Sequence, residues 1–290
     1  MFHCYLTSIS TLPKTMSESL PETTMNPSAF SLLNLPPTFE LPSCMEYFTL
    51  NAPPDTHIWR KPASRDTTTA PVVYTSLRHP FVIAEVTVTA DWEMEWDQAG
   101  LVIFAGMPPG EQALPPPRLR NHQWGHAWND PPMQSKWVKA GLEFTGGTLN
   151  ASCTVATTPS GSDLSLSPIS PTSPTSPTAM PHEALPLAMS SLRIKFERIG
   201  DSLWVWYRMP GISGFSSTPS PAAAGAEWRK VREVMGFFSG VEDKYGVWVG
   251  CYASRPMNFV PSHSWEADRG STTDGGRNGL LVEFEDLEIF

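Results

Sequence analysis

Residues 137–144 read WVKAGLEF, and this stretch decides the fold. Apolar residues occupy every second position, as in a β-strand whose side chains point in turn to opposite faces. We predict that Val138, Ala140, Leu142 and Phe144 face a core between two sheets. The opposite face combines an aromatic ring, a cation, a gap left by glycine and an anion, which is unusual for a simply solvated face. Its residues are Trp137, Lys139, Gly141 and Glu143.

Short stretches of the same kind lie on both sides of this one. They are rich in β-branched and aromatic residues and are bounded by Gly, Pro, Asn or Asp, which is typical of strands. Helical periodicity is almost absent, and the best exception is a short turn around residues 228–238. We therefore predict an all-β fold, a sandwich of two antiparallel sheets with long disordered loop insertions. The stretches are FVIAEVTVTADW (81–92), AGLVIFAG (99–106), LNASCTVAT (149–157), SLRIKFERIG (191–200), LWVWYR (203–208), VWVGCYASRP (247–256) and LLVEFEDLEIF (280–290).

The 290 residues divide into a tail and one domain. Residues 1–44 are rich in Ser, Thr and Pro without a sustained period, so we expect a flexible tail, followed by a single β-sandwich domain over residues 45–290. A low-complexity insertion at 157–190 interrupts the domain, and residues 210–227 and 261–278 are expected to be further long loops.

The insertion contains SPISPTSPTSPT, in which four serines each precede a proline. Such a run buries too little apolar surface to order itself, so a long disordered hairpin loop is the simplest interpretation. The alternative is a substrate for proline-directed kinases, modified at Ser167, Ser170, Ser173 and Ser176.

Charge and cysteine content exclude several classes of protein. The formal net charge is −9 and the sequence pI is near 5.3, and clustered Lys and Arg are lacking, which argues against nucleic-acid binding and against anionic membrane surfaces. The start of the chain lacks the features of an export signal, so we expect a cytoplasmic protein. The four cysteines have no metal-ligand spacing, and a reduced state with Cys153 and Cys251 in the core is the simpler interpretation.

A second strand resembles the first in carrying a glycine among polar residues. In residues 98–104, QAGLVIF, Gln98 and Gly100 share a face with Val102 and Phe104. Glycine inside a strand often marks the close approach of a ligand, a backbone or a large side chain. Gly100 and Gly141 therefore form the floor of a shallow binding groove, or else they receive Trp rings as part of the fold. The candidate rings are Trp204, Trp206 and Trp248.

In combination, these motifs resemble a family. FTLNAPPDTHIWRKP, DWEMEWDQAGLVIF, KWVKAGLEF, RIGDSLWVWY, WRKVREVMGFF and VWVGCYASRP, in this order, are similar to the cytosolic family of unknown function named after a fungal protein involved in regulating enolase. The resemblance covers most of the chain from about residue 45 and implies a concanavalin A-like jelly roll of the lectin and glucanase superfamily. It also marks recurrent positions, which here are Trp59, Asp97, Gln98, Gly100, Leu101, Lys136, Trp137, Lys139, Gly141, Glu143 and Tyr252.

The acids of residues 91–98, DWEMEWDQ, have two interpretations. As one strand they would form a carboxylate ladder like that of a glycosidase, but their order does not match the Glu-x-Asp-x-Glu strand of retaining glucanases. The resemblance implies instead a turn between Trp92 and Asp97 and a new strand at Gln98. We then expect Glu93 and Glu95 to be solvated at a hairpin tip, and Asp97 to cap the turn.

No motif points to a metal or a cofactor. His122 and His126 have a spacing that binds zinc on a helix, but the surrounding prolines forbid a helix and no third ligand is evident. Nucleophile elbows, phosphate loops and dinucleotide fingerprints are lacking in the sequence, so neither cofactor nor metal is expected.

Two hypotheses of function remain. The first is a non-catalytic cytoplasmic binding or regulatory protein that engages a protein or a glycan, and the resemblance links it to regulation of enolase metabolism. The groove residues are Asp97, Gln98, Gly100, Trp137, Lys139, Gly141 and Glu143. The second is a carbohydrate-binding lectin or a glycan-active hydrolase, in which Glu143 and Asp97 act as the carboxyl pair and Lys139 tunes their ionisation.

Overall fold

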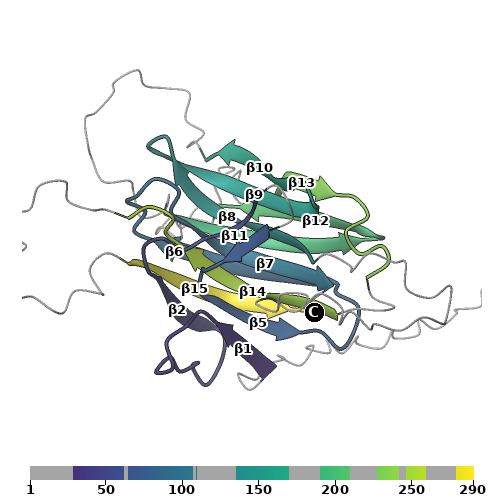
Figure 1. Ribbon diagram of the computed structural model, residues 1–290, viewed down its shortest axis with the longest axis horizontal. Helices are drawn as coiled ribbons and strands as arrows, with labels where there is room; N and C mark the ends of the chain where they lie inside the picture. The colour runs from purple at the N-terminus through teal and green to yellow at the C-terminus, as the bar shows by residue number, and fades with distance from the viewer. Residues whose placement is uncertain are drawn as a thin grey trace, which may run out of the picture.

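The computed structural model describes residues 29–61, 65–106, 109, 135–169, 190–209, 227–241, 246–258 and 279–290. Almost all of the regular structure in these ranges is strand, as the alternating stretches predict (Figure 1). The strands are β1 (Phe30–Leu33), β2 (Tyr47–Ala52), β3 (Ile58–Lys61), β4 (Arg65–Thr68), β5 (Val72–Ser76), β6 (Ile83–Ala90), β7 (Gln98–Gly106), β8 (Lys136–Thr145), β9 (Thr148–Thr158), β10 (Gly161–Pro168), β11 (Ser191–Ile199), β12 (Ser202–Arg208), β13 (Arg229–Val234), β14 (Gly246–Ser254) and β15 (Leu280–Ile289).

Two large antiparallel sheets form the sandwich, which confirms the predicted jelly-roll fold. One sheet has seven strands in the order β1-β5-β14-β7-β8-β9-β10, and the other has six in the order β13-β12-β11-β6-β15-β2. Strands β3 and β4 make a separate two-stranded sheet. Strands far apart in sequence are neighbours, such as β14 between β5 and β7, so the order of the strands positions the site.

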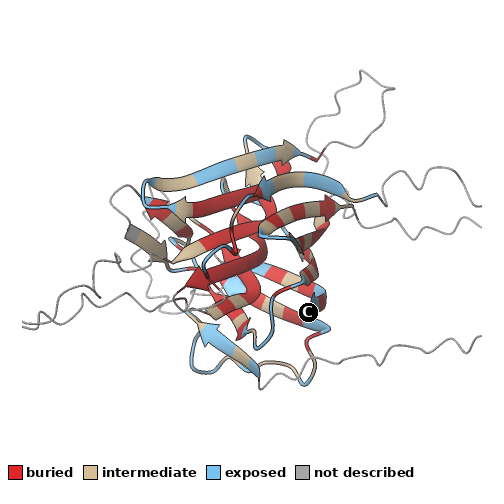
Figure 2. Cartoon of the chain, turned by 90° about the vertical axis from the view of Figure 1, so that its right-hand side faces the viewer, coloured by how far each residue is buried: buried red, intermediate tan, exposed pale blue. Residues whose placement is uncertain are grey.

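The core lies between the two large sheets. Val138, Ala140 and Leu142 of β8 are fully buried there, together with Leu101 and Ile103 of β7, as their alternation predicts. Figure 2 shows buried residues along the central strands and exposed ones on edge strands and turns. Cys153 and Cys251 are also buried, and both are free thiols, as expected.

A two-residue turn sets the register beside the site. Gly146 and Gly147 connect β8 to β9, and both have positive φ, 61° and 73°. Such turns match the twist of the flanking strands, and glycine adopts this conformation without steric cost. The turn pairs Glu143 with Asn150 and Gly141 with Ser152.

The flexible tail predicted over residues 1–44 extends too far, because part of this segment is ordered. Phe30–Leu33 forms the edge strand β1 on β5, and the Asn34 amide donates to the carbonyl oxygens of Thr68 and Ala70 at 2.8 and 2.9 Å. The four residues FSLL show no alternation that would mark a strand in a Ser- and Pro-rich stretch, but backbone pairing needs no particular side chain. Residues 1–28 lie outside the described part.

The insertion predicted at 157–190 and the turn predicted at 228–238 also need correction. Gly161–Pro168 forms β10, which pairs with β9, because an edge strand gains its hydrogen bonds from the neighbouring backbone whatever its composition. Residues 170–189 lie outside the described part. Arg229–Val234 is the strand β13 rather than helical, since its charged residues suit an exposed sheet edge.

Candidate functional site

The outer face of the seven-stranded sheet carries polar side chains where strands β14, β7, β8 and β9 lie side by side. Residues paired directly across antiparallel strands point to the same face, so the registers define rows across the sheet. One row is Ser254, Gln98, Glu143 and Asn150. The next is Tyr252, Gly100, Gly141 and Ser152, and the third includes Lys139 and Thr154. We call these ten residues the polar face.

Gly100 and Gly141 lie opposite each other at the centre of the polar face. A Cβ on Gly141 would lie 1.7 Å from the Ala99 carbonyl oxygen, and one on Gly100 would lie 2.0 Å from the Ala140 carbonyl oxygen. The glycines therefore permit a close approach of two backbones, and no Trp ring is among the nearest atoms. Trp204 and Trp206 belong to β12 of the other sheet, so the interpretation of the glycines as seats for those rings is wrong.

Lys139 is the cation of the polar face, and only 2% of it is exposed. Its ammonium donates a hydrogen bond to the Gln98 side-chain oxygen and lies 5.5 Å from the centroid of the Tyr252 ring and 6.0 Å from that of Trp59. Burial lowers the pKa of Lys139 to about 8, and the nearby Glu143 carboxylate opposes the shift. Lys139 and Gln98 were predicted together, and the structure brings them into contact.

Glu143 is the acid of the polar face, and it is buried in the same row as Gln98. Burial raises the pKa of Glu143, while the Lys139 ammonium and a hydrogen bond with Ser152 oppose the shift. A carboxyl group with a raised pKa keeps its proton over a wider pH range and can then donate as well as accept hydrogen bonds.

Among the described residues, two buried polar atoms, one on the polar face and one next to it, have no hydrogen-bond partner. They are the Tyr252 hydroxyl and the Trp137 indole nitrogen, and both residues are almost fully buried. Buried polar groups in folded proteins are nearly always paired, so these two atoms are exceptions. Trp137 itself lies on the same face of β8, one row beyond Lys139, and packs there in an apolar cluster with Phe104 and Ile58.

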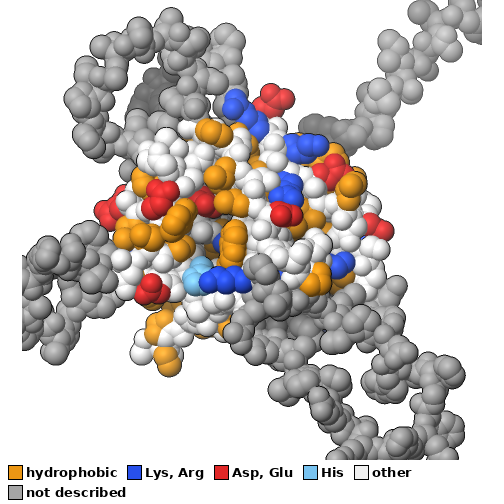
Figure 3. Space-filling view, turned by 45° about the horizontal axis from the view of Figure 1, so that its top comes forward, with side chains coloured by type: hydrophobic (Ala, Val, Ile, Leu, Met, Phe, Trp, Pro, Cys, Tyr) orange, Lys and Arg blue, Asp and Glu red, His pale blue; other side chains and the backbone are white. Residues whose placement is uncertain are grey.

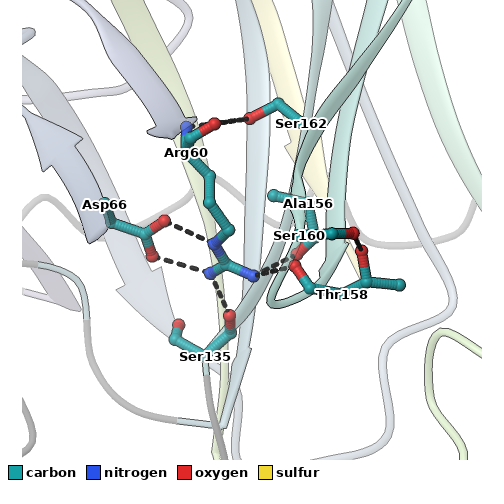
Figure 4. Close-up of polar contacts among 7 residues, drawn as sticks. All are labelled: Arg60, Asp66, Ser135, Ala156, Thr158, Ser160 and Ser162. Carbon is teal, nitrogen blue, oxygen red and sulfur yellow. Dashed lines mark hydrogen bonds and ion pairs between the residues drawn. The ribbon is translucent and has the colours of Figure 1, made fainter. Parts of the chain in front are cut away.

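The β3–β4 sheet holds an aromatic ring at the rim of the polar face. Arg60 is its anchor: the guanidinium makes an ion pair with Asp66 at 2.6 Å and donates to the carbonyl oxygens of Ser135, Ala156 and Thr158 (Figure 4). Five acceptors in fixed positions suit the planar guanidinium fork. These contacts of Arg60 hold the neighbouring residue Trp59 close to the ends of β8 and β9.

His57 lies on the same rim. It is half-buried, and burial together with the positive charges of Lys139 and Lys61 lowers its pKa. A neutral imidazole both donates and accepts hydrogen bonds, which suits an uncharged polar ligand.

Asp97 does not join the polar face. Its carboxylate pairs with Arg255 through contacts of 2.8 and 2.7 Å, and it accepts hydrogen bonds from the backbone N–H groups of Glu93 and Met94. The capping role predicted for Asp97 is thus present. Its backbone bonds to Phe144, the neighbour of Glu143, which places Asp97 in the row next to that of Glu143 and on the opposite side of the sheet.

The acids of the 91–98 turn do not form a ladder. Strand β6 ends at Ala90 and β7 begins at Gln98, so these acids lie on a turn, as the resemblance implied. Glu93 is exposed, whereas Glu95 accepts hydrogen bonds from the Thr145 hydroxyl and the Gly146 backbone, which lower the pKa of Glu95. Glu95 thus stabilises the β8–β9 turn rather than being simply solvated.

Several other predicted residues fall elsewhere. Ser167 lies on β10, while Ser170, Ser173, Ser176, His122 and His126 lie outside the described part. Among the described residues, no cluster of His, Cys, Asp and Glu suits a metal ion, and no helix is long and apolar enough to cross a membrane. On the face shown in Figure 3, Lys and Arg are scattered among acids and apolar residues.

Four contributors were missed or undervalued from sequence. Tyr252 and Ser254 alternate within VGCYAS, so their shared face was readable, but only strand order shows that this face continues the row of Gln98. Arg60 and Arg255 left no local signal, because their partners are distant in sequence.

Known proteins resemble this chain over most of its length. A family model described as "Protein of unknown function (DUF1349)" matches residues 33–290. The uncharacterized protein AN7484 of Emericella nidulans is 31% identical over 212 residues, which cover 73% of this chain and 78% of that protein.

Two solved structures align with most of this chain. A functionally unknown protein from Saccharomyces cerevisiae has a TM-score of 0.51 at 17% identity, over 92% of this chain and 98% of that one. The Bacteroides ovatus protein named Xyloglucan PUL GH43B has a TM-score of 0.48 at 11% identity, over 96% of this chain and 41% of that one.

Proposed function

The chain belongs to the DUF1349 family of proteins of unknown function, and on this premise we propose that it is a non-catalytic binding protein for a glycan. The ligand contacts the polar face from its rim, beside Trp59 and His57, because the side chains of the polar face are themselves at most 6% exposed. The observation that carries the proposal is the set of buried polar side chains on the outer side of the sheet, where the Tyr252 hydroxyl has no partner among the described residues.

The chemistry of the polar face suits a polyhydroxylated ligand. Amide, hydroxyl, carboxyl and amine groups alternate over a few ångströms, so donors and acceptors are both present for sugar hydroxyls. Trp59 is half-buried and offers an apolar surface for the C–H groups of a sugar ring. Ligand sites combine such a surface with a few convergent polar groups.

Binding is favoured over hydrolysis by the position of Asp97. Glycoside hydrolysis ordinarily needs two carboxyl groups flanking one bond. Asp97 is ion-paired with Arg255 on the other side of the sheet from Glu143, and the described residues supply no second carboxylate in the rows of the polar face.

A glycan array with the purified full-length protein tests the proposal, followed by titration calorimetry of each hit. We expect saturable binding that Trp59→Ala and Glu143→Gln both abolish. Trp204→Ala is the matched control, because Trp204 is also half-buried but lies on the other sheet. Undiminished binding by both variants at the polar face would contradict the proposal, and a blank array would favour a protein partner.

The resemblance to the enolase-regulation family extends the proposal. We propose that ligand binding serves a regulatory role in glycolytic metabolism in the cytoplasm. Fractionation of cells and measurement of enolase abundance in a strain that produces only Glu143→Gln protein test this part, and unchanged enolase abundance would contradict it.

A further inference from the structure

The six-stranded sheet divides into two halves of opposite charge. Strands β11, β12 and β13 carry seven Lys and Arg residues against two glutamates. Strands β2, β6 and β15 carry five acids and neither Lys nor Arg. The order β13-β12-β11-β6-β15-β2 places these two sets of strands on opposite sides of the midline between β11 and β6. We call the two sides the cationic half and the acidic half.

Two rows of paired residues carry this division onto the outer face of the sheet. Each row begins with a glutamate on β15 and ends with a cation on β12 or β13. Their side chains point away from the core, because the residues that alternate with them are buried between the sheets. The first row is Glu285, Thr87, Arg193 and Arg208, and the second is Glu288, Glu85, Lys195, Trp206 and Lys230.

Both halves of this face also expose apolar surface. In the cationic half, the rings of Trp204 and Trp206 stack with centroids 5.4 Å apart, and the Lys230 ammonium lies 4.3 Å from the Trp204 centroid. These contacts hold the rings in place before a partner binds, which reduces the entropy lost on association. In the acidic half, Tyr47 is 48% exposed and Leu281 is 56% exposed. The face thus offers both charge and apolar area to a protein partner.

We propose that this face is the interface between two copies of the chain. A two-fold axis along the midline, parallel to the strands, turns one sheet face onto the other and places β12 of each copy over β15 of the second copy. Such an interface is isologous, so each contact occurs twice. Glu285 of one copy then faces Arg208 of the other in the first row, and Glu85 faces Lys195 in the second. The inference is independent of the proposed glycan site, which lies on the other sheet.

The charge pattern fits a second copy better than it fits a partner of one charge. A polyanion such as a nucleic acid would be attracted by the cationic half and repelled by the acidic half, and a basic partner would meet the reverse. In the dimer, each half meets its opposite, so all four half-faces are in favourable surroundings.

The size of the face also suits a second copy. Six strands spaced about 4.8 Å apart make it roughly 25 Å wide, and seven residues at about 3.3 Å each make it roughly 23 Å long. The flat area is thus on the order of 600 Å², and the relief of the side chains adds to the accessible area. A stable interface buries about 800 Å² on each partner, so the partner has to cover most of the face, as a second copy of the sheet does.

Light scattering and analytical ultracentrifugation of the purified full-length protein test the inference. We expect a dimer, with twice the chain mass of 32.0 kDa, at micromolar concentrations in about 50 mM NaCl. Its dissociation constant should rise about tenfold or more in about 500 mM NaCl, because salt screens the charges at the interface.

Charge reversal gives the sharper test. The acidic variant carries Arg208→Glu and Lys230→Glu, and the basic variant carries Glu285→Lys and Glu288→Lys. Each variant alone should be a monomer, because both contacts of its dimer would bring like charges together. An equimolar mixture of the two should form a heterodimer, since one contact of that pair keeps the original charges and the other has them exchanged.

Lys61→Glu with Glu93→Lys is the matched control and should remain dimeric, because both residues are exposed but lie outside the six-stranded sheet. A monomer of the original protein at both salt concentrations would overturn the inference. A dimer that both charge-reversal variants retain, or a mixture of them that stays monomeric, would do the same. Thermal unfolding checks that each variant folds. If one does not, the salt dependence of the original dimer still decides, since a dissociation constant that salt leaves unchanged excludes an interface built on these charges.

Discussion

At the scale of single residues, the glycine pair and Glu143 are the most constrained parts of the polar face. The glycines are required because the backbones of β7 and β8 leave no room for a Cβ, a restriction that concerns the fold before it concerns a ligand. Glu143 is constrained by its environment, because burial disfavours its charged form.

Gly141→Ala is expected to destabilise the protein by about 3 kcal/mol or more, because the new methyl group would overlap the Ala99 backbone and the two strands must separate. Denaturant unfolding measures the change. Ser152→Ala is the control, since Ser152 lies in the same row and already carries a Cβ. Equal midpoints for the two variants would show that the strands adjust freely.

Glu143→Gln is expected to change how stability depends on pH. A carboxyl group whose pKa is raised by folding favours the folded state fully below its unfolded pKa, and that contribution is lost as pH rises through the folded pKa. The variant should therefore gain stability relative to the original protein from about pH 4.5 upward, by at most about 1.4 kcal/mol per pH unit. Urea unfolding of both proteins from pH 4 to 7 measures the difference in their free energies of unfolding. A variant whose advantage in stability grows as the pH is lowered would contradict this prediction.

At the scale of elements, the β3–β4 sheet and strand β10 frame the polar face from two sides. Both depend on long-range contacts: Arg60 bonds to the ends of β8 and β9, and the Arg60 backbone also donates to the Ser162 hydroxyl at 2.8 Å. The two elements are therefore coupled to each other as well as to the sheet.

Arg60→Lys should cost about 2–4 kcal/mol of stability, since an ammonium cannot satisfy five acceptors and leaves buried carbonyl oxygens unpaired. The exposed neighbour Lys61 supplies the control, Lys61→Arg. Thermal unfolding measures stability, and quenching of Trp fluorescence by acrylamide should rise if Trp59 is released. An unchanged melting temperature would mean that the contacts of the Arg60 guanidinium contribute nothing to stability.

Deletion of residues 160–180 should lower the melting temperature by several degrees, because it removes β10, exposes β9 as an edge and frees Arg232. An interpretation of the whole Ser-Pro stretch as a disordered insertion leads to the opposite expectation. Deletion of residues 172–180, which lie outside the described part, is the control and should leave the melting temperature within about 2 °C. Identical melting for both deletions would show that β10 adds no stability.

At the scale of the whole molecule, one core joins both large sheets, and the reactivity of its two buried thiols measures how often that core opens. Cys153 of β9 and Cys251 of β14 are fully buried, and burial raises the pKa of Cys153 to about 12. Both thiols belong to the seven-stranded sheet, but strands β7 and β8 lie between β14 and β9.

In a Cys4→Ser, Cys44→Ser variant, the two core thiols should react with a disulfide reagent at one common rate, at least a thousandfold slower than in the unfolded chain, because only global unfolding exposes them. Absorbance of the released thiolate, with mass spectrometry of each peptide, gives both rates. Faster labelling of Cys153 alone would reveal local opening near β10 and contradict a single cooperative core.

The sequence by itself determined the strands, their faces and most residues of the polar face, including Gln98, Lys139 and Glu143. Alternation is a local property, because successive side chains of a strand point to opposite faces whatever the strand pairs with. Composition was misleading at β10: the Ser- and Pro-rich stretch predicts disorder because it buries little apolar surface, but pairing with β9 orders residues 161–168.

Only the tertiary structure decided which strands are neighbours and which charges pair. Asp97 meets Arg255 across 158 positions of sequence, and this ion pair takes Asp97 away from the groove expected for it. The Tyr252 hydroxyl likewise acquires meaning only from strand order, which places it in the row of Gly100 and Gly141. The physical reason is that register and burial arise from contacts between distant segments, and no pattern within one segment records them.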